Sequence, residues 1–172
     1  MGPGPDAAST PVVLVEGEVA SRERDNYAFG QTLDFSLELM PMLSEPFDFD
    51  ITRTLVFYAL TRASVSHLNH HRKIRDDAVG GIFPNDMRRA VSILSIADFL
   101  AMPYETVRRH VHALVAAGWC DRVGSREFIV RSEILSDARL SSKRQTVIDL
   151  TKTFVTRMHT EVVSAPTGKE PV

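Results

Sequence analysis

The sequence predicts a mainly helical fold with one small β-hairpin. Apolar residues recur at helical spacing over 51–68, 96–117 and 142–163. Two β-rich runs, 119–123 and 126–130, surround a glycine turn, which is typical of a hairpin. The length of 172 residues suits one domain with appendages.

Composition excludes several classes of protein. The hydrophobic fraction of 44% and the charged fraction of 24% are ordinary for a soluble globular protein. The single cysteine, Cys120, excludes a disulfide framework and a cysteine-rich zinc module. No run is apolar enough to span a bilayer, and the N-terminus lacks the pattern of a secretory signal. We therefore expect a cytoplasmic protein without membrane association, metal site or cofactor.

The N-terminal part offers weaker signals. Residues 1–11 are rich in proline and glycine and predict a disordered tail. Residues 12–83 form an acidic segment, a central helix and a basic loop, beginning with a strand-like run at 12–15. Residues 33–43 fit a helix and a strand about equally, because apolar residues alternate there in a run of good helix formers.

The central helix is expected over residues 51–68. Asp48 or Asp50 can cap its N-terminus. Its apolar residues lie on more than one face, which is typical of a central helix or of a subunit interface. A basic loop over 69–83 follows, with a Gly80-Gly81 turn.

Residues 84–131 predict a short helix, a tight turn, a longer helix and a hairpin. A short strand is expected to end near Ile93, and Ser95 can cap a helix from 96 to 101. Pro103 suits the first turn of the next helix, which Gly118 ends. This order of elements predicts a winged helix-turn-helix, whose second helix enters the major groove of DNA.

The two helices of this motif each have an inner and an outer face. The predicted inner side chains are Ile96, Ala97, Leu100, Val107, Val111 and Leu114. The N-terminal turns of the second helix, about 103–117, meet DNA in such motifs. The predicted DNA-binding residues are Tyr104, Glu105, Thr106, Arg108, Arg109 and His112 on that helix, with Arg122 and Arg126 beside the hairpin tip.

The run from Ile96 to Leu114, IADFLAMPYETVRRHVHAL, resembles the pattern I-A-D-x-L-G-x-x-x-E-T-V-x-R-x-[LV]-x-x-L. That pattern belongs to winged helix-turn-helix bacterial transcription regulators of the cyclic-AMP-receptor-protein and fumarate-nitrate-regulator type. The resemblance implies that Glu105 and Arg109 read base edges, Glu from cytosine and Arg from guanine.

The resemblance covers about 45 residues and has two departures. Tyr104 replaces the Arg or Ser that often precedes the Glu. Ala101 stands where the family has a turn glycine, which is tolerable if its φ stays negative. The segment before the motif is too short for the family's effector domain, so the family's effector is not carried over. A small-molecule effector of another kind stays an open prediction.

Residues 132–164 predict a C-terminal helical segment, with an amphipathic helix over 142–163 capped by Ser141 or Ser142. The last residues, 165–172, predict a loose tail. Helix-turn-helix proteins commonly pair to read two half-sites, so we expect a homodimer that uses the flanking helices.

The near-neutral net charge of −2 conceals two opposed halves. Residues 1–50 hold 2 basic and 10 acidic side chains, whereas residues 51–172 hold 18 and 12. This asymmetry favours double-stranded DNA as the partner. No catalytic motif occurs, so we do not expect an enzyme. The alternative is a winged helix that docks proteins and does not bind DNA.

Overall fold

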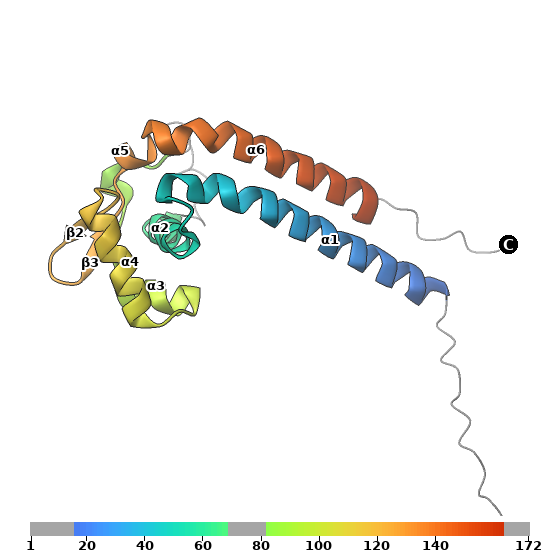
Figure 1. The fold of residues 1–172 in the computed structure, drawn as a ribbon, viewed down its shortest axis with the longest axis horizontal. Coiled ribbons are helices and arrows are strands. Elements are labelled where there is room, and N and C mark those ends of the chain that lie inside the picture. Colours follow the sequence, from blue (N-terminus) through green and yellow to red (C-terminus); the bar gives the residue numbers. More distant parts are fainter. Residues whose placement is uncertain (1–15, 69–81, 164–172) are drawn as a thin grey trace, which may run out of the picture. The chain divides into compact units, whose positions relative to one another are not determined.

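The computed structural model describes residues 16–68 and 82–163 (Figure 1). The fold is mainly helical with a small three-stranded antiparallel sheet, which confirms the predicted class. The predicted tails at 1–11 and 165–172, the strand-like run at 12–15 and all but two residues of the basic loop lie outside the described residues.

The helices are α1 (Glu16–Ser44), α2 (Ile51–Ala63), α3 (Ile93–Leu100), α4 (Tyr104–Ala116), α5 (Ser132–Leu135) and α6 (Ala138–Met158). The strands are β1 (Val91–Ser92), β2 (Asp121–Val123) and β3 (Glu127–Ile129). Short 3-10 turns occupy Glu45–Phe47, Ser66–Leu68 and Asn85–Met87, and one π-helical turn, His159–Val163, follows α6. None of the helices in the described ranges has the length and apolar character needed to cross a membrane.

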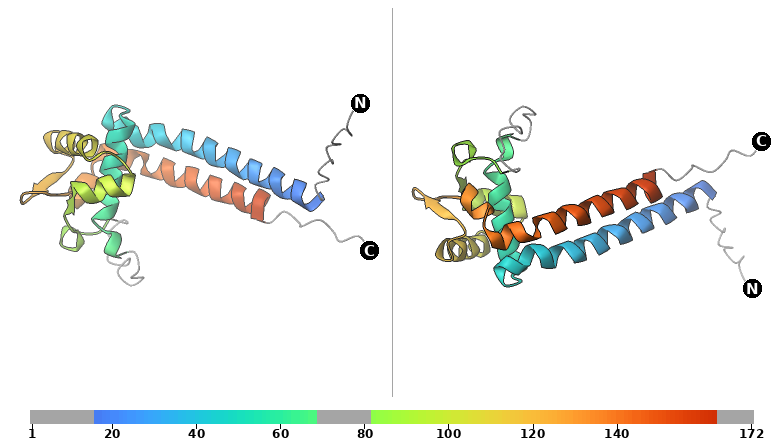
Figure 2. Two further views of the ribbon diagram at one scale, coloured as in Figure 1. Left: turned by 90° about the horizontal axis from the view of Figure 1, so that it is seen from below. Right: turned by 90° about the horizontal axis from the view of Figure 1, so that it is seen from above.

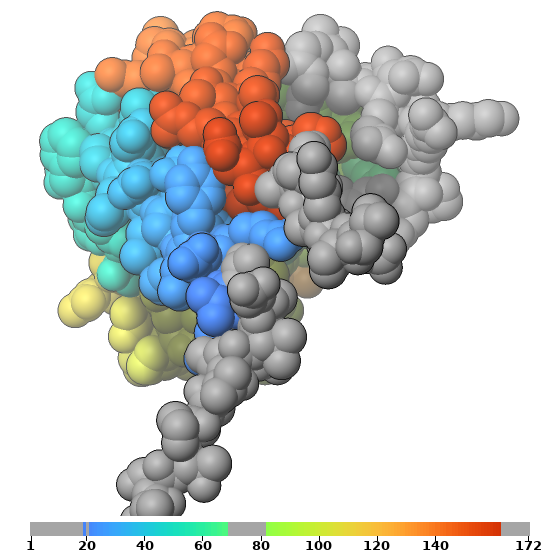
Figure 3. Space-filling model, turned by 90° about the vertical axis from the view of Figure 1, so that its right-hand side faces the viewer, coloured from blue at the N-terminus to red at the C-terminus, as the bar shows by residue number. Residues whose placement is uncertain are grey.

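The chain divides into two compact units. The core unit comprises residues 37–149. In the paired-helix unit, the described residues are 16–36 of α1 and 150–163, which include the end of α6. These two helical stretches run antiparallel side by side, and the rings of Phe35 and Phe154 stack at 4.5 Å (Figures 1 and 2). In the space-filling view the side chains of these two helical stretches lie against each other (Figure 3).

Residues 33–43 are helical, so the strand interpretation is wrong. Phe35 and Leu39, four residues apart, are both half-buried, whereas Leu37 between them is exposed. The period of four rather than two therefore decides the structure. The helix also extends far upstream of this stretch, to Glu16.

Helix α2 begins where predicted, and Asp50 rather than Asp48 is its cap. The Asp50 carboxylate accepts a hydrogen bond from the Arg53 backbone N–H at 2.8 Å. The predicted end at residue 68 is wrong, because α2 ends at Ala63. The Ser64 carbonyl accepts the backbone N–H of Arg89 at 2.9 Å, so it makes a bond between segments instead of continuing the helix.

Helix α3 starts three residues earlier than predicted. Ser92, not Ser95, is the cap: its hydroxyl accepts the Ser95 backbone N–H at 3.1 Å. Ile93 thereby becomes the first helical residue and is buried. The predicted strand before it is confirmed for Val91 and Ser92 alone.

The turn between α3 and α4 does not keep Ala101 at a negative φ. Ala101 has a φ of +51°, in the left-handed region that favours glycine. Helix α4 then begins after Pro103, within one residue of the prediction, and the chain leaves it at Gly118 with a φ of +73°. The alanine at position 101 thus carries backbone strain that Gly118 avoids.

The hairpin forms as predicted, with Gly124 in its turn at a φ of +66°. Strand β3 lies between β2 and β1, so the sheet order is β1-β3-β2. Phe128 of β3 pairs with Arg122 on one side and Val91 on the other. The third strand ties the hairpin to the start of α3.

Helix α6 begins at Ala138, four residues before the prediction, so neither Ser141 nor Ser142 is its cap. The Asp137 carboxylate precedes the helix and accepts the Arg139 backbone N–H at 2.9 Å. The same carboxylate also pairs with the Arg139 guanidinium, which lowers its pKa to about 2.

The core unit is organised around α2, which packs against both α3 and α4. Five of the six predicted inner side chains are buried, and Leu100 is half-buried. Trp119 and Cys120 belong to the same core, and burial raises the pKa of the Cys120 thiol to about 12. The large fully buried side chains include Phe47, Phe57, Leu60, Ile96, Leu114 and Val107.

Candidate nucleic-acid interface

Helix α4 has one buried and one exposed face. Val107, Val111 and Leu114 recur at spacings of four and three and are buried against α2 and α3. Glu105, Arg108, Arg109 and His112 occupy the opposite side, and all four are exposed. Because the apolar face fixes the rotation of the helix, the two arginines point to solvent.

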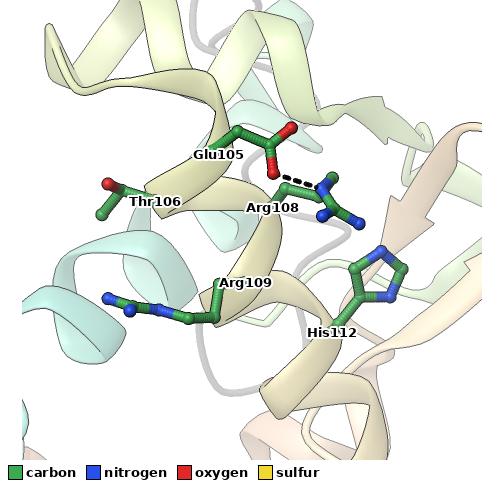
Figure 4. A pocket seen from close by; sticks show the side chains of 5 residues that line it. All are labelled: Glu105, Thr106, Arg108, Arg109 and His112. Atoms are coloured by element: carbon green, nitrogen blue, oxygen red, sulfur yellow. Dashed lines mark hydrogen bonds and ion pairs between the residues drawn. The ribbon is translucent and has the colours of Figure 1, made fainter.

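Glu105 and Arg108 form an ion pair on this exposed face (Figure 4). The Arg108 Nε donates to the Glu105 carboxylate at 2.8 Å, across one helical turn. An exposed pair of this kind contributes about 0.5 kcal/mol or less, so it orients the guanidinium more than it stabilises the fold. His112 lies on the same side of the helix (Figure 4).

Thr106 and Arg109 extend on the other side of α4 (Figure 4). Within the described part of the chain, the Arg109 side chain has no hydrogen bond or ion pair. The resemblance named Glu105 and Arg109 as the pair that reads bases. In this structure Glu105 forms an ion pair with Arg108, and the Arg109 side chain extends away from both.

An open hollow lies along this stretch of α4. Its volume is about 640 Å³, and it is lined by Glu105, Thr106, Arg108, Arg109 and His112. All five are residues that the sequence predicted for the interface. Its open shape suits contact with a large surface rather than enclosure of a small molecule.

A second hollow joins α4 to the hairpin and to the start of α3. Its volume is about 600 Å³. Five predicted residues line it, namely Tyr104, Arg108, His112, Arg122 and Arg126. Sequence reasoning missed Ser92, Leu94 and Ser125, which also line it. Leu94 was missed because the helix start was placed after it, although Ser92 is itself a good capping residue.

Two contacts hold the hairpin side of this hollow. The His112 ring meets the ring of Phe128 edge-on at 5.9 Å, which joins α4 to β3. Arg122 donates to the Ser125 carbonyl across the hairpin turn. Arg126 has no such bond among the described residues, and its side chain is exposed.

His110, on the buried side of α4, anchors this helix to the start of α2. Its Nδ1 lies 3.7 Å from an oxygen of Asp50, the residue that caps α2. Burial lowers the pKa of His110, and the nearby Asp50 carboxylate partly opposes that shift. The imidazole is therefore neutral at neutral pH.

Arg88 braces the other end of the core unit. The side chain is buried, and its Nε donates to the Phe83 carbonyl at 3.1 Å. A second nitrogen donates to the Val130 carbonyl at 3.3 Å, just after β3. Burial lowers the pKa of this guanidinium, with Glu133 acting in the opposite direction. Arg88 is thus a structural cation and not part of the exposed surface.

No group of three or more histidine, cysteine or acidic side chains that could hold a metal ion is found across residues 16–68 and 82–163. Comparisons with known proteins add no assignment: no family model matches the chain, and neither does any curated protein or solved structure. The arrangement of the side chains themselves carries the functional argument.

Proposed function

We propose that residues 84–131 form a winged helix-turn-helix and that the chain is a cytoplasmic, sequence-specific DNA-binding transcription regulator. The observation that carries the proposal is the hollow between α4 and the hairpin. Arg108, Arg122, Arg126 and His112 converge there from two elements that are separate in sequence. A cluster of this kind matches the polyanionic surface of DNA.

The dimensions of α4 support insertion into the major groove. Its 13 residues make a helix about 20 Å long. An α-helix with its side chains is about 10–12 Å across, which matches the major groove, about 12 Å wide. The exposed N-terminal turns carry Glu105, Arg108 and Arg109, which suit cytosine N4 and the N7 and O6 of guanine. Glu105 orients Arg108 before contact, so the two side chains would approach adjacent bases together.

The hairpin arginines would contact the phosphate backbone. Arg122 and Arg126 lie beside the turn and are exposed, Arg122 held by its hydrogen bond to the Ser125 carbonyl and Arg126 without a bond to any described residue. Phosphate contacts add affinity and salt dependence and do not choose sequence. Arg126→Ala should therefore lower the slope of log affinity against log salt by about one unit.

Selection from a random pool of DNA duplexes, with the full chain as bait, tests the proposal. We expect one enriched motif. Arg108→Ala combined with Arg109→Ala should weaken binding to that motif by roughly 30-fold or more, since base contacts contribute about 1–3 kcal/mol each.

The charge-matched control combines Lys152→Ala with Arg157→Ala, two exposed cations of α6. This variant should keep the wild-type affinity. An equal loss of DNA affinity in both double variants would show that binding depends on net charge alone and not on the exposed face of α4. Failure to enrich any motif, at low and at physiological salt, would favour the alternative of a protein-docking winged helix.

The paired-helix unit supports a homodimer as the DNA-binding form. Among residues 19, 21–36 and 150–162 of this unit no side chain is buried, and Phe29 and Leu33 are exposed one helical turn apart. Apolar side chains at that spacing favour packing against another helix. A second copy of the chain would also supply the second half-site reader.

Sedimentation tests the dimer at micromolar concentration. We expect twice the chain mass of 19.2 kDa for the wild type. Phe29→Asp with Leu33→Asp should shift it to the monomer, whereas Thr32→Asp with Ser36→Asp, also on exposed positions of α1, should not. A wild-type monomer would overturn this part of the proposal.

A further inference from the structure

A smaller pocket lies inside the core unit, away from the exposed face of α4. It is formed by the C-terminal end of α1, the turn after it, α2, α5 and the first half of α6, and its volume is about 190 Å³. Most of the lining is apolar, including Met42, Leu43, Pro46, Leu140, Val147 and Ile148. A mostly apolar pocket with a few polar groups is the usual form of a small-molecule site.

Three cationic side chains also line this pocket, and two of them are neutralised. Arg139 forms an ion pair with Asp137 at 2.9 Å and lies over the Trp119 ring at 4.1 Å. Lys143 forms an ion pair with Glu45 at 2.8 Å. These two cations are therefore already matched by carboxylates.

Arg144, the third cation, is held differently. One of its terminal nitrogens donates to the backbone carbonyl of Leu135 at 2.8 Å, and its side chain is half-buried. No carboxylate of the described residues lies within 4.0 Å of this guanidinium. The pocket therefore has one positive charge in excess, beside an apolar lining.

Tyr58 supplies a neutral donor to the same pocket. It comes from α2, and its hydroxyl makes no hydrogen bond to any other residue that the structure describes. Burial raises the pKa of Tyr58, so the hydroxyl keeps its proton and can donate. A carboxylate can accept from a guanidinium and a hydroxyl together.

We propose that this pocket binds a small monoanion with a compact apolar body, of the class of an aromatic carboxylic acid. The carboxylate would accept hydrogen bonds from Arg144 and Tyr58, and the body would lie against the apolar lining. One negative charge matches the single excess positive charge, and the volume of about 190 Å³ limits the ligand to one ring or a short chain.

The pocket has a route to the DNA-contacting helix. The Tyr58 ring meets Phe57 at 5.2 Å and Phe47 at 6.2 Å. Both phenylalanines contact Trp119, which follows α4 after Gly118. An occupant that moves Tyr58 would thus act on the cluster that supports the C-terminal end of α4. This consequence for DNA binding rests on the proposed function, whereas ligand binding itself does not.

Calorimetric titration of the full chain, without DNA, tests the site with four probes. Phenylacetate should bind. Phenylacetamide, which has the same shape without the charge, should bind at least about tenfold more weakly, because hydrogen bonds between two charged groups are stronger than those to a neutral amide. Acetate lacks the ring and phenethylamine reverses the charge, so neither should give measurable heat.

Variants locate the binding. Arg144→Gln should weaken phenylacetate binding at least about tenfold, and Arg144→Lys should restore part of the loss. Arg131→Gln removes an exposed cation outside the pocket and should change nothing. Leu140→Trp should block the pocket, and a thermal melt of each variant checks folding.

Several results would overturn the proposal. These are no binding of phenylacetate, equal binding of its amide, or unchanged affinity in both Arg144→Gln and Leu140→Trp. Because the titration contains no DNA, its failure would leave the duplex selection unaffected, and a failed selection would leave the titration unaffected.

Discussion

The two units of this chain differ in how far they bury their apolar side chains. The core unit buries aromatic and aliphatic side chains from α2, α3, α4 and the sheet in one contiguous cluster. Among residues 19, 21–36 and 150–162 of the paired-helix unit, by contrast, no side chain is buried. Two helices cannot enclose a core, because each covers only one face of the other.

The core unit thus encloses its own apolar side chains, whereas the paired-helix unit leaves some of them exposed. In the core unit, burial orients α4 and leaves its charged face exposed to solvent. In the paired-helix unit, Phe35 and Phe154 stack, yet Phe29 and Leu33 stay open to solvent. We therefore expect mutations in the two units to act on different measurements.

The largest effect is expected from the same substitution made once in each unit. Leu114→Ala removes a side chain that is 0% exposed and should lower the free energy of unfolding by about 2–5 kcal/mol. Leu33→Ala removes one that is 47% exposed and should cost less than about 1 kcal/mol in the monomer. Urea denaturation followed by circular dichroism, which reports the helices of both units, measures both.

Leu33→Ala should instead weaken the proposed homodimer, which sedimentation at several concentrations would detect. Equal losses of unfolding free energy in the two variants would contradict the comparison, since Leu33 would then contribute as much to stability as the buried Leu114.

Glycine substitutions should give opposite signs in the two units. Gly30 is inside α1, and a Cβ there would meet nothing within 4 Å, so Gly30→Ala should stabilise the helix by about 0.5–1 kcal/mol. Gly118 has a φ of +73°, so Gly118→Ala should destabilise the core unit by about 1–2 kcal/mol. Thermal melts followed by circular dichroism measure both changes.

Ala101→Gly is the matched test of this reasoning, because the native alanine already has a φ of +51°. It should stabilise the core unit by up to about 1 kcal/mol. A destabilised Ala101→Gly variant would show that packing, not backbone strain, controls this turn.

The smallest expected effect is a pH dependence confined to the core unit. Because burial lowers the pKa of His110 below its ordinary value of 6.5, the unfolded chain binds a proton that the folded chain resists. The free energy of unfolding should therefore fall as the pH drops below about 6.5, until the folded-state pKa is passed.

His110→Gln should flatten this part of the profile, measured by urea denaturation at several pH values. An unchanged profile in His110→Gln would assign the pH dependence to other groups.

Much of the core unit could be predicted because its signals are local. The spacing of Val107, Val111 and Leu114 identified the buried face of α4, and the glycines at 118 and 124 identified its end and the hairpin turn. The helix boundaries were less predictable. Ser92 and Ser95 are equally good caps by composition, and the pairing of Ser92 with Glu127 selects Ser92, because β1 ends at that pair.

The sequence by itself determined which side chains are inside and which residues α4 offers to a partner, because helical periodicity places them without reference to the rest of the chain. Tertiary structure alone decided the contacts between distant segments. It brought Arg122 and Arg126 to the hollow beside Arg108, and Tyr58 to the pocket beside Arg144. The reason is that such contacts depend on how the elements pack in three dimensions, which no local pattern records.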